Sequence, residues 1–276
     1  MEHNEQRMLY QWLTNGLAKD NCRIQLAYVE GHGQWWSWLS NNSAGIWCDN
    51  PSWRQALQAY SGSADPTLVT EDLFPCISAA WFALLGETIN ARLSQKPIDY
   101  RLPKGIYPVI MVGECQFVVV NIGLEKWQAA FADWTPFEVP SLQVTVKLLA
   151  GFIADCENIR HKYGYWLAGD VDIRQGEALL WWHEPLAIVT LIDVNQLWIK
   201  EIRPTVIFNQ IPYLAQVATI DLPLEQLYAL IATENLTGKV TLETRVCLLH
   251  NEQPVAWGEL LTAQTGMAFH CLELEK

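Results

Sequence analysis

The sequence carries little charge and no long apolar run, and both absences narrow the possible functions. Charged residues make up 17% of the 276 residues and the net charge is −12, so the chain lacks the basic surface of a nucleic-acid-binding protein. No apolar run approaches the roughly 20 residues of a membrane-spanning helix, and the N-terminal residues lack the apolar centre of a signal peptide. We therefore expect a cytoplasmic protein that binds no nucleic acid and does not insert into a membrane.

Motifs for catalysis or metal binding are also missing. The seven cysteines are dispersed without a CxxC pair, which indicates buried small side chains rather than metal ligands. No HExxH motif, phosphate-binding glycine loop or GxSxG elbow occurs. Asp170 and Asp172 lie at a turn, where solvated carboxylates are common, and Lys239 takes the place of Asp170 in the repeat described below. We expect no catalytic residue, no metal and no cofactor, and hence a protein that is not an enzyme.

Tryptophan, in contrast, is abundant, and half of all residues are hydrophobic. The N-terminal half carries a group of tryptophans within a short stretch, namely Trp35, Trp36, Trp38, Trp47 and Trp53. Tryptophan is enriched in cores and also at binding surfaces. The mixed spacing favours a core, but a platform for a carbohydrate or an aromatic small molecule stays open as an alternative.

Residues 1–138 are predicted to form one mixed α/β domain. Apolar periodicity predicts helices at residues 5–19 and 77–93. Alternation predicts strands at 23–29 and 35–39, joined as a hairpin by a turn at 30–33. A second hairpin is predicted within residues 109–120, around Gly113.

The second half of the chain contains an internal repeat. A shift of 69 residues aligns residues 169–192 with residues 238–261 without a gap. The identical pairs are Gly169/Gly238, Val171/Val240, Leu179/Leu248, Leu180/Leu249, Pro185/Pro254, Ala187/Ala256 and Leu191/Leu260. The shared order of turn and alternating apolar residues predicts a duplicated β-rich module.

The repeat divides this half into modules at residues 141–202 and 212–276, joined by a connector at 204–212. A lone unit of about 60 residues buries too little surface to be very stable, and a small sheet has edges that need cover. The modules are therefore predicted to pair with one another, within one chain or between two chains. Short helices are predicted at 152–163 and at 223–230.

The repeated pattern resembles the SPOA modules of the flagellar switch proteins FliM and FliN and of the type III secretion SctQ family, which includes YscQ, HrpQ and SpaO. Gly169-Asp170-Val171 is similar to the start of the first module, and residues 251–260 (NEQPVAWGEL) are similar to the hairpin of the last one. A mixed N-terminal domain before two SPOA modules is the SctQ layout. The expected fold class is therefore α+β, with an N-terminal α/β domain and two tandem SPOA modules.

The resemblance implies a structural component of the sorting platform, the C-ring-like assembly at the cytoplasmic, inner-membrane base of an injectisome. The implied partners are an SctL-like stator, an SctK-like adaptor and, through the stator, an SctN-like ATPase. Chaperone–effector complexes are further implied partners, as are the protein's own C-terminal SPOA fragment and self-association. A flagellar switch component of FliM or FliN type is an alternative.

Contact residues for such partners are expected in the second module. Its short helix and the strand after its hairpin carry apolar residues that a partner can cover. The predicted interface residues are Leu224, Leu227, Val255, Trp257, Gly258, Glu259 and Leu260. Gly258 and Glu259 occur only in the second copy, where Val189 and Thr190 stand in the first, so the second module is predicted to keep the shared docking function.

Overall fold

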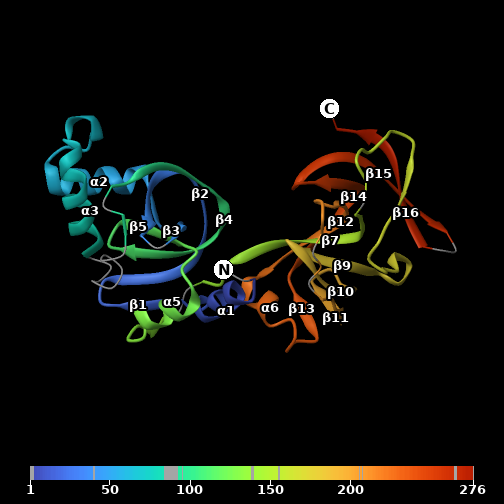
Figure 1. Cartoon of the computed structure of the whole chain (residues 1–276). Helices are drawn as coiled ribbons and strands as arrows, with labels where there is room; N and C mark the ends of the chain where they lie inside the picture. Colours follow the sequence, from blue (N-terminus) through green and yellow to red (C-terminus); the bar gives the residue numbers. More distant parts are fainter. Residues whose placement is uncertain are drawn as a thin grey trace. The chain divides into compact units, whose positions relative to one another are not determined.

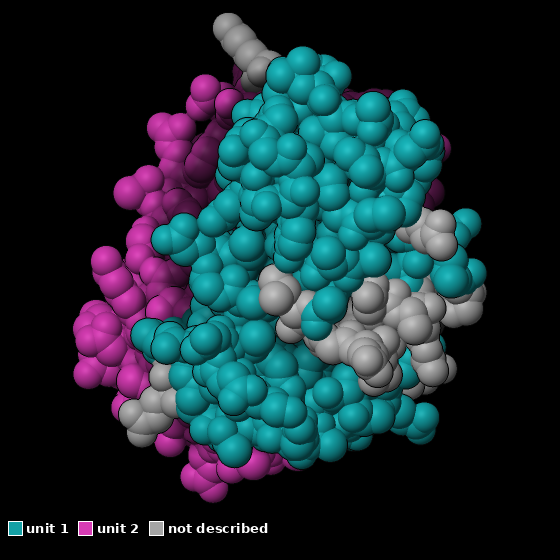
Figure 2. Space-filling view, turned by 90° about the vertical axis from the view of Figure 1, so that its left-hand side faces the viewer, with its two compact units in different colours: residues 1–142 teal, residues 143–276 magenta. Residues whose placement is uncertain are grey.

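The computed structural model describes residues 3–39, 41–83, 93–94, 96–137, 140–154, 156–204, 206, 208–263 and 266–275. The chain divides into two compact units, unit 1 over residues 1–142 and unit 2 over residues 143–276 (Figures 1 and 2). Both contain antiparallel sheets, and helices are fewer than strands, so the fold class is α+β as predicted.

Unit 1 begins with a helix and continues mainly as strands. Its helices are α1 (His3–Leu13), α2 (Asn50–Ser61), α3 (Phe74–Phe82) and α5 (Leu124–Ala130), with short 3₁₀ turns η1 (Pro66–Leu68) and η2 (Glu71–Leu73). Its strands are β1 (Leu17–Lys19), β2 (Cys22–Trp38), β3 (Asn41–Asp49), β4 (Ile98–Val112), β5 (Cys115–Val120) and β6 (Thr135–Pro136).

Four of these strands close into a ring. β4 pairs with β2 and β5, and β3 pairs with β5 and also with β2. A closed ring leaves its long strands without free edges. The long strand β2 also extends beyond the ring to pair with β1, which in turn pairs with β6.

The tryptophans of unit 1 form its core. Trp36 lies within ring-contact distance of Trp53, Trp81 and Phe82, and its indole nitrogen donates a buried hydrogen bond to Ser78 Oγ at 3.0 Å. All five tryptophans between residues 35 and 53 are buried, none more than 6% exposed. They therefore hold strands and helices together, and the exposed aromatic platform considered above is not formed by them.

Two predictions in unit 1 are wrong. Residues 23–38 lie in one continuous strand, β2, and do not form a hairpin, and Leu39 lies in the turn that follows. At residues 30–33 the pairing with β4 merely shifts register, with Gly31 at φ 133°, so a glycine-rich turn signal marks a bulge instead. The first helix also ends at Leu13, because Leu17–Lys19 pairs with β2. The hairpin around Gly113 is confirmed, whereas most of the predicted helix beyond α3 lies outside the described residues.

Unit 2 is built almost entirely from strands. Its first half contains β7 (Gln143–Ile153), β8 (Gly164–Trp166), the 3₁₀ turn η4 (Ile173–Gln175), β9 (Glu177–Trp182), β10 (Glu184–Asp193) and β11 (Gln196–Ile202). Its second half contains β12 (Tyr213–Pro223), α6 (Leu224–Tyr228), β13 (Asn235–Thr237), β14 (Lys239–His250), β15 (Gln253–Ala263) and β16 (Gly266–Leu274).

These strands form a single ten-stranded sheet in which the halves mirror one another. The order is β13-β11-β10-β9-β7-β12-β14-β15-β16-β8 (Figure 1). β7 and β12 pair antiparallel at the centre. Each outermost strand comes from the opposite half, because β13 pairs with β11 and β8 pairs with β16. The halves thus exchange edge strands within one chain, and each covers part of the other's edge.

The two halves share irregularities as well as topology. Leu186 in β10 and Val255 in β15 are each an extra residue in the pairing with the preceding long strand. Each of these strands also shifts register against its outer neighbour a few residues later. In β10 the shift relative to β11 falls between Ile188 and Val189, and in β15 the shift relative to β16 falls between Trp257 and Gly258. Bulges at matching positions are independent support for the duplication, since a bulge is a specific feature of a strand.

The structure corrects the alignment of one strand. Ala187 lies opposite Leu180, and its equivalent Ala256 lies opposite Leu248. Leu180 therefore corresponds to Leu248, one residue away from the gapless alignment. The cause is the turn, which has one residue between β9 and β10, His183, and two between β14 and β15. A slip of one residue moves each side chain to the opposite face.

The short helices of the two halves differ. The predicted helix at 223–230 is confirmed as α6, and Leu224, Leu227 and Leu230 are all buried. The predicted helix at 152–163 is wrong, since β7 continues to Ile153 and the described residues from there to β8 contain no helix. The first half thus replaces the helix with an irregular segment.

Candidate protein interface

The predicted interface residues separate into a buried pair and a surface group. Leu224 and Leu227 are 1% and 3% exposed, so they support α6 from inside and offer no surface to a partner. The others lie on β15, where Glu259 is exposed, Val255, Trp257 and Leu260 are half-buried and Gly258 is buried. The interface prediction is therefore corrected for α6, and β15 remains as the candidate surface.

Three strands of the second half form a groove around Gly258 and Glu259. The cavity has a volume of about 520 Å³ and is lined by Thr244, Arg245, Val246, Gly258, Glu259, Leu260, Leu272 and Glu273. Arg245 forms an ion pair with Glu273 at 3.4 Å, and His270 Nδ1 lies 3.2 Å from Glu259 Oε1. The groove combines an apolar floor with carboxylates at its rim, which suits contact with another protein.

Gly258 is required by the close approach of the neighbouring strand. A Cβ atom at this position would lie 2.1 Å from the backbone oxygen of His270 and 2.7 Å from the ring of Phe269. Phe269 is fully buried and cannot move without opening the core. The glycine therefore allows β16 to pair closely with β15 and the Phe269 ring to lie against it, and its first role is structural.

The side chains next to Gly258 divide between the two faces of the sheet. Val255 packs against the core cluster that contains Phe269. Trp257 packs against the cluster that contains Trp181 and Leu249 on the other face, and its indole nitrogen donates a hydrogen bond to Glu275 at 3.1 Å. Both side chains thus contribute mainly to folding and remain partly exposed.

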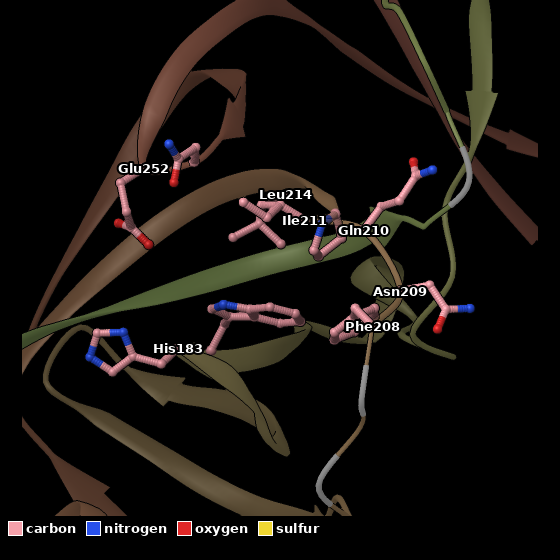
Figure 3. Close-up of a pocket in the computed structure, with 10 residues that line it drawn as sticks. His183, Phe208, Asn209, Gln210, Ile211, Leu214 and Glu252 are labelled. Atoms are coloured by element: carbon pink, nitrogen blue, oxygen red, sulfur yellow. The ribbon is translucent and has the colours of Figure 1, made fainter. Parts of the chain in front are cut away.

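A second cavity lies where the halves meet. It has a volume of about 390 Å³ and is lined by Trp181, His183, Phe208, Asn209, Gln210, Ile211, Pro212, Leu214, Asn251 and Glu252 (Figure 3). Its walls include both hairpin turns, at His183 and at Asn251–Glu252, together with the connector. The sequence predicted the turns but gave no signal that they border one cavity, because they come together only when β7 pairs with β12.

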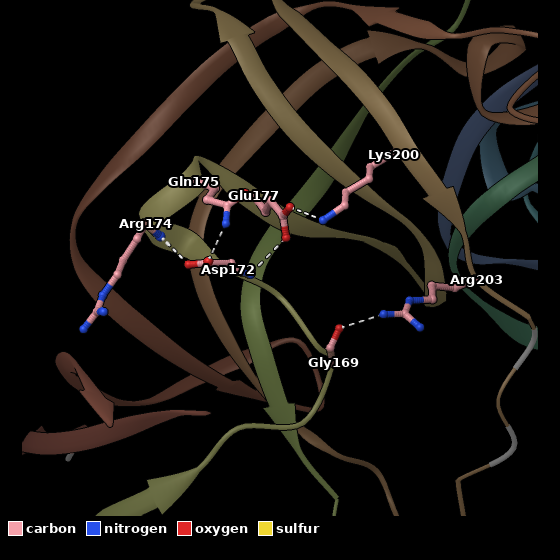
Figure 4. Close-up of polar contacts among 7 residues, drawn as sticks. All are labelled: Gly169, Asp172, Arg174, Gln175, Glu177, Lys200 and Arg203. Carbon is pink, nitrogen blue, oxygen red and sulfur yellow. Dashed lines mark hydrogen bonds and ion pairs between the residues drawn. The ribbon is translucent and has the colours of Figure 1, made fainter. Parts of the chain in front are cut away.

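A polar network in the first half was not predicted either. Glu177, at the start of β9, is 4% exposed and forms an ion pair with Lys200 of β11. It also accepts a hydrogen bond from the backbone nitrogen of Asp172 at 3.0 Å (Figure 4). The hydrogen bond from Lys200 lowers the pKa of Glu177, against the effect of burial. The sequence signal that could have indicated this network is Glu177, a single charged residue at the start of the otherwise apolar strand β9.

The acidic turn beside this network has a capping role. Asp172 accepts hydrogen bonds from the backbone of Arg174 at 3.1 Å and from the side chain of Gln175 at 3.0 Å. Arg203 donates a hydrogen bond to the backbone oxygen of Gly169 at 3.2 Å. Within the described residues, no group of three or more His, Cys, Asp or Glu side chains is placed to hold a metal ion.

The cysteines follow the prediction in part. Cys48, Cys247 and Cys271 are buried, as expected for small core residues, whereas Cys76 is exposed. Burial raises the pKa of Cys247 to about 11, so its thiol is protonated and unreactive near neutral pH.

Several large apolar side chains of unit 2 are exposed. They include Leu191, Ile192, Val194 and Trp198 around the β10–β11 hairpin, with Leu242 on β14 and Leu261 on β15.

None of the helices in the described part of the chain combines the length and apolar character needed to cross a membrane.

Comparison with known proteins adds no relative. No protein-family model matches the chain, and no curated protein matches its sequence.

Proposed function

We propose that the protein is a non-enzymatic structural component of the cytoplasmic sorting platform of a type III secretion system, of the SctQ type. In this proposal residues 141–202 and 212–276 are its two SPOA modules. The proposal rests on the sequence resemblance and on the architecture of unit 2. In this proposal the protein holds other subunits of the platform together and catalyses no reaction.

The observation that carries the proposal is the exchange of β8 and β13 between the duplicated halves. Each half adds the outermost strand to the sheet of the other, so that either half alone would leave the edge of β11 or of β16 unpaired. Such mutual completion yields one continuous scaffold from two marginal modules. The outermost strands of this scaffold, β13 and β8, lie at the two ends of its ten-stranded sheet.

The proposed contact surface is the groove on β14, β15 and β16. Glu259 is exposed and Leu260 is partly exposed there, beside the Arg245–Glu273 pair. We assign this surface to an SctL-like stator, and through it to an SctN-like ATPase. An SctK-like adaptor and chaperone–effector complexes are the further partners, for which no surface is assigned.

The test is co-purification of the tagged full chain from its own host. The stator and the ATPase are expected to purify with it, and deletion of its gene is expected to abolish secretion of the exported substrates. Glu259→Arg should lower stator recovery severalfold, while Glu125→Arg, the same charge change on α5 of unit 1, should not. Normal secretion without the gene would overturn the proposal.

Genomic context distinguishes the flagellar alternative. Neighbouring genes for secretion export and ATPase components support the SctQ assignment, whereas flagellar genes support a switch component. Motility in the deletion strain then provides the matching functional test, because loss of motility with normal secretion would replace the proposal by the alternative.

A further inference from the structure

Among the described residues of unit 2, one ion pair joins the two halves. Lys147 of β7, in the first half, contacts the carboxylate of Glu252 in the β14–β15 turn of the second half. The Lys147 side chain is 18% exposed and that of Glu252 is 61% exposed. The pair is therefore partly shielded from water, and a charge change on either side will be felt by the other.

The duplication identifies the equivalent residues in the other half. Lys147 lies opposite Trp181, which lies opposite Pro185. Leu214 lies opposite Leu249, which lies opposite Pro254. Because Pro185 and Pro254 are equivalent in the repeat, Leu214 occupies the position of Lys147.

The turn residues are matched in the same way. His183 precedes Pro185 by two positions, and Glu252 precedes Pro254 by two positions. The mirror image of the Lys147–Glu252 contact is thus the combination of Leu214 with His183. Both of these residues line the cavity where the halves meet, and Figure 3 shows His183 and Glu252 on its walls.

We propose that the Lys147–Glu252 pair selects pairing between unlike halves over pairing between like halves. Two first halves would bring Lys147 to the β9–β10 turn, where His183 stands at the position of Glu252 and the neighbouring carboxylate, Glu184, stands at the position of Gln253. Two second halves would bring the buried Leu214 to the carboxylate of Glu252. Only the combination of a first with a second half places a carboxylate at the position that Lys147 contacts, so the asymmetry discriminates against both alternatives. The inference concerns pairing alone and goes beyond the proposed role in secretion.

The first test is a charge-reversal cycle in the full chain. Lys147→Glu and Glu252→Lys should each lower the folding equilibrium constant by about fivefold or more, the upper range for a partly exposed pair. The double variant should return to within about twofold of the wild type, because it restores opposite charges. Urea unfolding followed by circular dichroism gives these constants.

The matched control is the Arg245–Glu273 pair, which lies wholly within the second half and is exposed by 61% and 64%. Its reversal cycle should show little coupling. If the Lys147/Glu252 double variant loses as much stability as the two single variants together, the inference is wrong, since the residues would then act separately.

The second test measures partner choice between chains. The Lys147→Glu and Glu252→Lys chains, carrying different tags, are unfolded and refolded together at high concentration. A dimer that exchanges halves between them contains two restored pairs, so native mass spectrometry should show at least tenfold more mixed dimer than two differently tagged wild-type chains give. An equal amount of mixed dimer, including none in both mixtures, would overturn the selection.

Discussion

The two halves of unit 2 share one topology but differ at the centre of their equivalent strands. In β15 the residue after the register shift relative to β16 is Gly258. In β10 the residue after the equivalent shift relative to β11 is Val189, which is fully buried. The difference follows from the neighbouring strand, because Phe269 of β16 packs over Gly258. Equivalent backbone positions of the two halves thus carry different residues when the strands beside them differ. A position of the repeat where the two residues are not alike can therefore still lie on equivalent strands.

The largest effect is expected from exchanging these residues. Gly258→Val should destabilise the protein by about 3 kcal/mol or more, since its Cβ would overlap the His270 backbone. Val189→Gly removes a buried side chain and should cost roughly 2 kcal/mol. Urea unfolding of both variants checks the order. A smaller effect of Gly258→Val than of Val189→Gly would show that the two halves pack alike.

The helix α6 of the second half offers the next comparison, between a buried and an exposed leucine. Leu227→Ala should cost about 2–4 kcal/mol, because Leu227 is 3% exposed. Leu261→Ala, on a residue 46% exposed, should change stability by less than about 0.5 kcal/mol. Thermal unfolding measures both. Equal losses would place Leu227 on the surface, in agreement with the original interface prediction.

The ion pair between Lys200 and the buried Glu177 in the first half predicts that stability depends on pH. Lys200→Met leaves the buried Glu177 carboxylate without its ion-pair partner and should cost about 1–2 kcal/mol at neutral pH. Because the folded-state pKa of Glu177 is lowered, its contribution is complete above the unfolded pKa of about 4.3 and is lost as pH falls through the folded value. Unfolding curves at several pH values check this.

The control for this experiment is Glu177→Gln, which removes the titrating group. The stability difference between wild type and Glu177→Gln should shrink as pH falls below about 4. A difference that stays constant over that range would mean that the network does not stabilise the ionised carboxylate.

The smallest effect is expected at the hairpin turns. His183 has φ 64°, a left-handed conformation that costs a non-glycine residue about 1 kcal/mol. His183→Gly should therefore stabilise the protein by roughly 0.5 kcal/mol, whereas Asn251→Gly should be nearly neutral because Asn tolerates φ 50°. Thermal unfolding distinguishes these outcomes, and equal shifts would indicate that both turns carry the same strain.

Much of the architecture was predictable from local patterns. Turn residues predict a hairpin turn at residues 251–254, and the structure has it at Asn251–Glu252, while leucine spacing predicts the helix that is found as α6. The turn signal at residues 30–33 failed because a tertiary partner, β4, keeps the strand continuous across it. The candidate site was found only in part, since hydrophobic residues of α6 and β15 look alike in sequence while burial separates them.

The sequence by itself determined the duplication and the α+β class, because periodicity and turn chemistry are local properties. Tertiary structure decided which strand completes which edge, since β8–β16 and β13–β11 pairs join segments far apart in the chain. It also decided the register of β9, where a turn shorter by one residue moves Leu180 into the place of Leu248. Side-chain alternation has a period of two, so a single residue of turn length changes which face a side chain occupies.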